Sequence, residues 1–161
     1  MSETRARARP VRDAARWVVA VALVAMLVTP AAHAHAGSTV EVTIGSVLAT
    51  DVGQDFDVRL AAMKAQFESL FRYSSYRLVK QERRAIEWGA GASFDIPGGR
   101  YLVVTPKELR DSKVSMKVML LEGGRPLVDT SVALRNHGVL LLGGPKQQEG
   151  VLIIAIGAET E

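Results

Sequence analysis

The chain lacks cysteine altogether, and it holds few aromatic and few histidine residues. Of its 161 residues, three are His and 6% are Phe, Trp or Tyr. The absence of thiols excludes a disulfide-stapled miniprotein and any Cys-based metal or redox site. Hydrophobic residues make up 48% of the chain and charged residues 23%, which excludes a disordered chain. The composition therefore indicates a globular protein with an ordinary core, and it names no function.

The N-terminal residues have the pattern of a secretory signal peptide. Five arginines precede the apolar run Trp17–Val28, and Pro30 follows it. Two overlapping small-x-small sites come next, in Ala32–Ala34 and Ala34–Ala36. The run is shorter than the roughly 20 residues that a membrane-spanning helix needs. We predict a signal peptide over residues 1–36, cleaved after Ala34 or Ala36. No stable membrane span would then remain, and the protein would be periplasmic or secreted.

Removal of this leader changes the charge of the protein. The full chain has a formal net charge of +3, which is compatible with nucleic-acid binding. Residues 1–36 contribute five of the 20 basic residues and two of the 17 acidic ones, so 15 of each remain. The exported chain is therefore neutral, and we expect no nucleic-acid partner.

The remaining segment is dominated by short apolar runs that alternate with turn residues. Ser38–Thr50 alternates β-branched with polar residues, as a half-buried strand does. Lys107–Asp111 is polar and is expected to be a connector, and Gly143-Gly144-Pro145 is expected to open a loop. The further strands expected are Tyr76–Trp88 with a bulge near Gln81, Ser93–Ile96, Arg100–Thr105, Val114–Leu120, Leu127–Leu134, Val139–Leu142 and Val151–Ile156.

One segment, Asp57–Phe71, has helical periodicity. Its apolar residues recur on one face of a 3.6-residue period, and Asp55 or Asp57 could cap its first N–H groups. Turn residues recur between the strands at spacings that favour antiparallel neighbours. We predict a single exported domain over residues 37–161, mainly β with one helix. Its fold would be an antiparallel β-sandwich or open barrel of about eight strands, with the amphipathic helix packed on it.

Two predicted strands, Val139–Leu142 and Val151–Ile156, are apolar on both faces. A strand with one wet face should alternate, so something must cover the second face. The helix, a second sheet or another protein could do so. The predicted interface residues are Val151, Ile153, Ile154 and Ile156. Their partner would be an envelope protein or a second copy of the chain, binding by β-addition.

A second candidate site combines hydroxyl and aromatic groups. Tyr73, Ser74, Ser75 and Tyr76 join the helix to a strand, and Trp88 ends that strand. Loops on a rigid scaffold often carry binding residues, and aromatic rings stack on sugars. These five residues are the predicted contacts of the alternative function, a small-ligand or carbohydrate-binding domain.

The residues that catalysis and metal binding require are scarce. His137 lies in an Asn-His-Gly turn, and no G-x-S-x-G nucleophile motif is present. Asp51, Asp55 and Asp57 do not have the spacing of a calcium loop. A hydrolase, the less favoured alternative, would need paired carboxylates in a cleft, and no pair stands out. We therefore expect no catalytic residue, no metal and no cofactor.

Short motifs give the chain a resemblance to a group of small exported bacterial proteins. They are Ser74-Ser75-Tyr76, Gly143-Gly144-Pro145 and Gly150-Val151-Leu152-Ile153. The resemblance implies a strand and helix followed by a β-rich half, and it implies no activity. The last hairpin is also faintly similar to secretin-type outer-membrane channels. The leading expectation is a non-catalytic envelope protein that acts as a protein-binding or assembly module, with an accessory role in secretion as one form of it.

Overall fold

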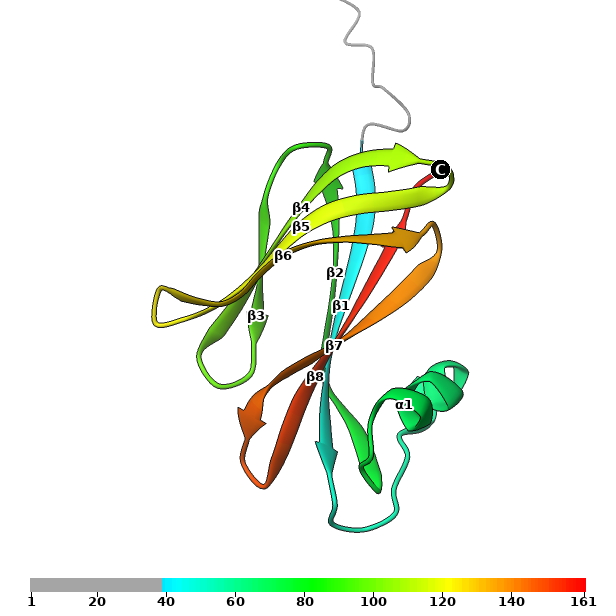
Figure 1. The fold of residues 1–161 in the computed structure, drawn as a ribbon, viewed down its shortest axis with the longest axis vertical. Helices are drawn as coiled ribbons and strands as arrows, with labels where there is room; N and C mark the ends of the chain where they lie inside the picture. The colour runs from blue at the N-terminus through cyan, green and yellow to red at the C-terminus, as the bar shows by residue number, and fades with distance from the viewer. Residues whose placement is uncertain (1–38) are drawn as a thin grey trace, which may run out of the picture. The chain divides into compact units, whose positions relative to one another are not determined.

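The computed structural model describes residues 39–161, which form eight strands and one short helical segment. The strands build two four-stranded antiparallel sheets that pack together, which confirms the predicted fold in its sandwich form (Figure 1). Sheet A contains, in spatial order, β2 (Ser75–Glu87), β1 (Thr39–Thr50), β8 (Gly150–Glu159) and β7 (Gly138–Gln147). Sheet B contains β3 (Ala92–Ile96), β4 (Arg100–Arg110), β5 (Lys113–Glu122) and β6 (Arg125–Arg135).

The core between the sheets is built by alternation along each strand. Val40, Val42 and Ile44 of β1 all point inward and are buried. Successive side chains of a strand point to opposite faces, so every second apolar residue of the facing strands meets them. The other fully buried members from these strands include Leu102, Val104, Val118, Leu120, Leu152, Ile154 and Ile156. The alternation therefore determines which face of each sheet is enclosed.

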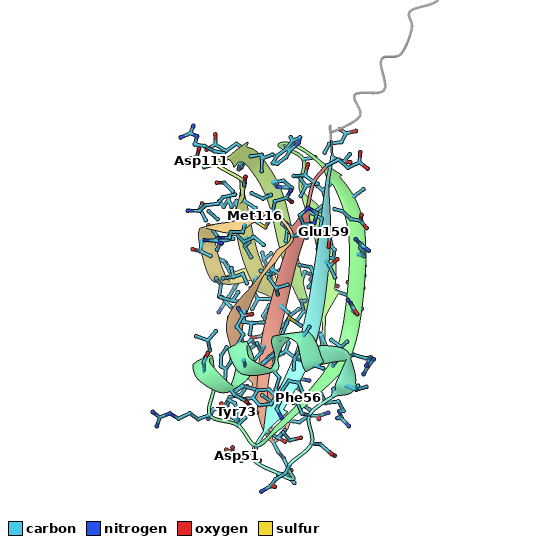
Figure 2. All side chains as sticks on the ribbon, turned by 90° about the vertical axis from the view of Figure 1, so that its right-hand side faces the viewer. Asp51, Phe56, Tyr73, Asp111, Met116 and Glu159 are labelled. Atoms are coloured by element: carbon cyan, nitrogen blue, oxygen red, sulfur yellow. The ribbon has the colours of Figure 1, made fainter. Side chains whose placement is uncertain are left out.

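The helical segment covers the outer face of sheet A and is divided into two parts. A 3₁₀ helix, η1 (Val58–Met63), leads into the α-helix α1 (Lys64–Leu70), which crosses the front of the sheet (Figure 2). The single helix predicted over residues 57–71 is thus interrupted at its middle. Asp57 is the N-cap, as expected, because its side chain accepts the backbone N–H of Arg59 at 3.0 Å.

A second core lies beneath these helices. Leu60 and Phe67 are buried against residues on the outer face of sheet A. Their partners on the strands are Val47, Ala49, Tyr76, Leu78, Leu141, Ile153 and Ala155. Sheet A is therefore covered on both faces over the half that the helices cross.

This arrangement corrects the interface predicted on β8. Ile154 and Ile156 face sheet B, and Ile153 faces the helices; all three are 0% exposed. Val151 packs against the second core and is half-buried. Moreover, β8 pairs with β1 on one side and β7 on the other, so it has no free edge. The two-sided apolar pattern is explained by the helix and the second sheet.

Two strand boundaries differ from those expected. Lys107–Asp111 is not a connector, because β4 continues to Arg110 and pairs with β5. Gly143-Gly144-Pro145 lies within β7, where a register irregularity falls between Gly143 and Lys146. Both errors fall where a strand leaves the core and its burial pattern fades. The bulge expected near Gln81 is present, at Val79, which the β1 register skips between Leu78 and Lys80.

The predicted signal peptide lies outside the described residues. Among residues 39–161, neither helical segment has the length and hydropathy required to traverse a bilayer.

Candidate functional site

Four of the five residues of the predicted hydroxyl and aromatic site, residues 73–76, lie where the helix leads into β2. Tyr76 is 2% exposed, and its hydroxyl donates to the carbonyl oxygen of Phe71 at 3.1 Å. Its ring lies 5.1 Å from that of Phe67 and 5.6 Å from that of Phe56, centroid to centroid. Burial raises the pKa of Tyr76 above its ordinary value. The phenol is therefore a core group, which corrects its prediction as an exposed contact.

The three residues before Tyr76 in the chain also contact the second core, β1 or the hollow beside Tyr76. The backbone N–H of Tyr73 donates to the Tyr76 hydroxyl at 3.3 Å, and Tyr73 packs on the second core (Figure 2). Ser74 is exposed, and its N–H donates to the carbonyl of Thr50 at 3.1 Å. Ser75 lines an open hollow of about 450 Å³ beside Tyr76. These contacts tie the turn to β1 and pack Tyr73 and Tyr76 against the second core.

Trp88 lies at the opposite end of β2 from this turn. Twelve residues separate it from Tyr76, which corresponds to about 40 Å along an extended strand. Trp88 packs against the core between the sheets, whereas Tyr76 packs beneath the helix. The structure therefore does not bring together the three rings that the ligand-binding hypothesis required.

Asp57 organises the junction between the helix and β2. Its carboxylate accepts from the Arg59 guanidinium at 2.6 and 2.9 Å and from the backbone N–H of Leu78 at 3.1 Å. The hydrogen bonds from Arg59 hold the pKa of Asp57 well below its ordinary value. Arg59 also donates to the carbonyl of Leu78 at 2.8 Å. Every one of these partners is within the chain, so this charge pair is structural.

The outer face of sheet B presents an uncovered apolar patch. No element packs on this face among the described residues, in contrast to sheet A. Tyr101 is 52% exposed and Leu127 45% exposed, and half-buried apolar residues lie between them. We call the following residues the sheet B patch: Tyr101, Val103, Met119, Leu121 and Leu127.

The strand register makes the four residues of the sheet B patch on β4 and β5 continuous, and Leu127 lies at the irregularity of β6 between the partners of Leu120 and Leu121. Tyr101 is paired with Leu121, and Val103 is paired with Met119 on the next rung of β4 and β5. Their chain neighbours Leu102, Val104 and Leu120 are fully buried in the core, so the patch residues point away from it. Large exposed apolar patches on soluble proteins are typical of interaction sites.

A smaller concavity lies on sheet A beside η1. Gly45 and Gly157 form part of its floor, and its volume is about 270 Å³. Neither glycine has a positive φ, and a Cβ on either would meet its neighbours at 3.5 Å or more. We call this concavity the glycine shelf; its other lining residues include Thr43, Leu60, Met63, Gln81, Arg83 and His137.

Charged groups close one end of the glycine shelf. Arg83 forms ion pairs with Glu41 and, at 2.8 Å, with Glu159. His137 occupies the β6–β7 turn with a φ of 62°, and its backbone N–H donates to the carbonyl of Ala158 at 2.9 Å. The turn geometry expected for Asn-His-Gly is therefore present. Within residues 39–161, no three His, Asp or Glu side chains come together as a metal site would require.

The sequence contains the signal for the sheet B patch, although it was not used to predict the patch. Leu102-Val103-Val104 and Met119-Leu120-Leu121 are apolar at consecutive positions, as β8 is. In β8 the second face is covered by the helix, and in β4 and β5 it is not. The topology of the chain determines which strands the helix covers. The apolar pattern of a strand does not show whether the helix packs on it.

Comparison with protein family models, with curated protein sequences and with solved structures finds nothing that matches this chain. The site must therefore be interpreted from its own chemistry.

Proposed function

We propose that this protein is a non-catalytic module of the bacterial envelope that binds another protein through the sheet B patch. The single observation that carries this proposal is the asymmetry between the two sheets. Sheet A has its outer apolar residues buried beneath η1 and α1, whereas sheet B leaves Tyr101 and Leu127 in solvent. A partner that covers this face would do for sheet B what the helix does for sheet A.

The chemistry of the patch favours a protein as its ligand. The face is broad and apolar, with tyrosine and methionine, which are enriched in protein interfaces. Polar residues border it, including the Lys117–Asp129 ion pair at 3.3 Å. An apolar centre with a polar border is the usual anatomy of an interface. A role as an assembly module, including one accessory to secretion, is consistent with this surface.

The cellular location belongs to the same proposal. The basic, apolar and small-residue pattern of residues 1–36 supports export to the periplasm or beyond. An exported domain without a membrane span would rely on protein contacts to localise at the envelope.

Site-specific crosslinking tests the proposal. A photo-reactive residue at position 101 should give a discrete crosslinked product in intact cells, and the same group at position 58 should not. Val58 is 83% exposed on η1, so it is the matched control for exposure. Leu127→Lys should abolish the product formed from position 101, because a charge in an apolar interface is left unpaired. Equal crosslinking from both positions, or a product that survives Leu127→Lys, would contradict it.

The glycine shelf supports a second candidate function, the binding of a small polar ligand. Glycine inside a strand weakens it and often marks a place where a ligand approaches the backbone. Gly45 and Gly157 lie on the two central strands of sheet A without a conformational need for glycine. Gly157→Val would fill the shelf, so it should abolish ligand-induced shifts in the melting temperature and leave crosslinking from position 101 unchanged.

A further inference from the structure

The four sheet edges differ in how well they are protected against pairing with another strand. The edge strand β2 carries six charged residues, β3 has only five residues, and β7 is interrupted by its irregularity at Gly143. Charges, shortness and irregularity are the usual protections of an edge. β6 has eleven residues, and its own irregularity lies near its start, where the β5 register skips Leu127. From Val128 to Leu134 the strand is regular, and its one charged residue is Asp129. The edge of β6 is therefore the one suited to β-addition.

The direction of the free backbone groups of β6 follows from one hydrogen bond. The N–H of Asn136 donates to the carbonyl of Ser112 at 2.8 Å, which extends the ladder between β5 and β6. Antiparallel ladders alternate every second residue, so Leu134, Val132 and Thr130 also direct their backbone groups toward β5. The odd-numbered residues, Asp129, Ser131 and Ala133, then direct theirs outward to the open edge.

The sequence of this edge is self-complementary about Thr130. Residues 127–133 read Leu-Val-Asp-Thr-Ser-Val-Ala, which is apolar at both ends and polar in the middle. In an antiparallel pair of two copies centred on Thr130, Val128 faces Val132 of the partner and Asp129 faces the partner's Ser131. Leu127 then faces the partner's Ala133. This register joins odd residues with odd ones, as the free backbone groups require, and opposes no like charges.

We infer that two copies of the chain pair through their β6 edges, antiparallel and centred on Thr130. A two-fold interface must be self-complementary, and this edge is. Val128 and Val132 are only half-buried against the core between the sheets, and pairing would cover them. The two copies of sheet B would become one eight-stranded sheet with both patches on the same face. This contact shares Leu127 with the sheet B patch, but Tyr101 lies on β4, which β5 separates from the β6 edge. Crosslinking from position 101 and disulfide trapping at position 130 can therefore each fail without the other.

Disulfide trapping tests the register directly, since the chain has no cysteine of its own. Paired residues without ladder hydrogen bonds lie about 4.5 Å apart at Cα, within the range a disulfide bridges. Thr130→Cys should therefore form a disulfide-linked dimer when the protein, expressed as the full-length chain and purified from the envelope, is oxidised. Ala133→Cys is the matched control: it is more exposed, but its two copies would lie about 20 Å apart.

Charge substitutions at Ser131 provide a second readout that does not depend on cysteine. The dimer contains two contacts between residue 131 of one copy and Asp129 of the other. Ser131→Lys would place opposite charges at both contacts, and Ser131→Asp would place like charges there. Sedimentation equilibrium should show the dissociation constant fall about two- to thirtyfold for the lysine variant and rise for the aspartate variant. Lys117 of the same chain lies opposite residue 131 on β5, so either charge could also change the stability of the single chain. The melting temperature of each variant measures that change in folding separately from the change in association.

The outcomes are distinct. A monomer at all concentrations, or efficient trapping through Ala133→Cys, would overturn the proposed pairing. Equal weakening of the dimer by both Ser131 variants would also overturn it, because that result is expected of a different register, in which residue 131 of one copy lies opposite residue 131 of the other. None of these outcomes affects crosslinking from position 101, which tests the proposed function separately.

Discussion

The two faces of β8 lead to a quantitative prediction about stability. Ile153 and Ile154 are adjacent, both are fully buried, and they belong to different cores. Ile154 faces sheet B, and Ile153 faces η1 and α1. Ile→Ala in a packed core costs about 2–5 kcal/mol, because the transfer free energy is lost and a cavity remains. We expect Ile153→Ala and Ile154→Ala to lower the free energy of unfolding by similar amounts within that range.

Urea denaturation followed by circular dichroism would measure this effect. Both variants should unfold at lower urea with an unchanged m-value, since the surface exposed on unfolding stays the same. Val58→Ala is the control; its side chain is exposed, and we expect a change within about 0.5 kcal/mol. If Ile153→Ala were as harmless as Val58→Ala, the helix would not cover the outer face of sheet A. Sheet B would then not be the one sheet of the described residues with an uncovered face, and the asymmetry behind the proposed function would be refuted.

Three further perturbations test other parts of the structure. Hydrogen bonds from Arg59 lower the pKa of Asp57, so its carboxylate stabilises the fold at neutral pH and loses that effect as the pH falls below about 4. Asp57→Asn should therefore flatten the acid side of a profile of unfolding free energy against pH, and an unchanged slope would count against this role of Asp57. Arg100→Ala should lower the free energy of unfolding, measured in urea, by about 1–3 kcal/mol, because the mostly buried Arg100 side chain donates to Gln147 at 2.8 Å and so joins the two sheets. The same change at the exposed Arg110 is the control and should lower it little. His137→Val should lower the free energy of unfolding by about 1–2 kcal/mol, because the φ of 62° at this position disfavours a β-branched residue, and His137→Gly should not. Equal melting temperatures for the two variants would contradict this expectation.

Alternation of apolar residues was sufficient to predict most strands and the sandwich. It worked where one face of a strand contacts the core, as at Val40, Val42 and Ile44. It failed for the end of β4, where residues 107–110 project beyond the sandwich and are all exposed. Backbone pairing with β5 continues there without burial, so the residues are mostly charged and show no apolar alternation. Strand ends outside a core leave no hydrophobic signal.

The candidate sites were harder to predict than the fold. Two-sided apolar strands were interpreted as interfaces on β8, although its second face is closed by Phe67 and Leu60 from a segment about 90 residues earlier. Tyr76 was interpreted as a contact, and it is instead the ring around which that segment packs. Both errors have the same origin: the local pattern shows that a residue has an apolar neighbour, and only the topology shows which neighbour it is.

The position of β8 between β1 and β7 constrains how this protein can fold as it is made. β1, the first of the described strands, pairs directly with β8, the last of them, with Ile44 opposite Ile156. Until β8 is available, β1 has one open side and both cores lack their central strand. Loop closure over such a separation is slow, and pairing between distant segments delays folding. The two cores can therefore be completed only when β8 inserts between β1 and β7, although the hairpins of sheet B can pair without it.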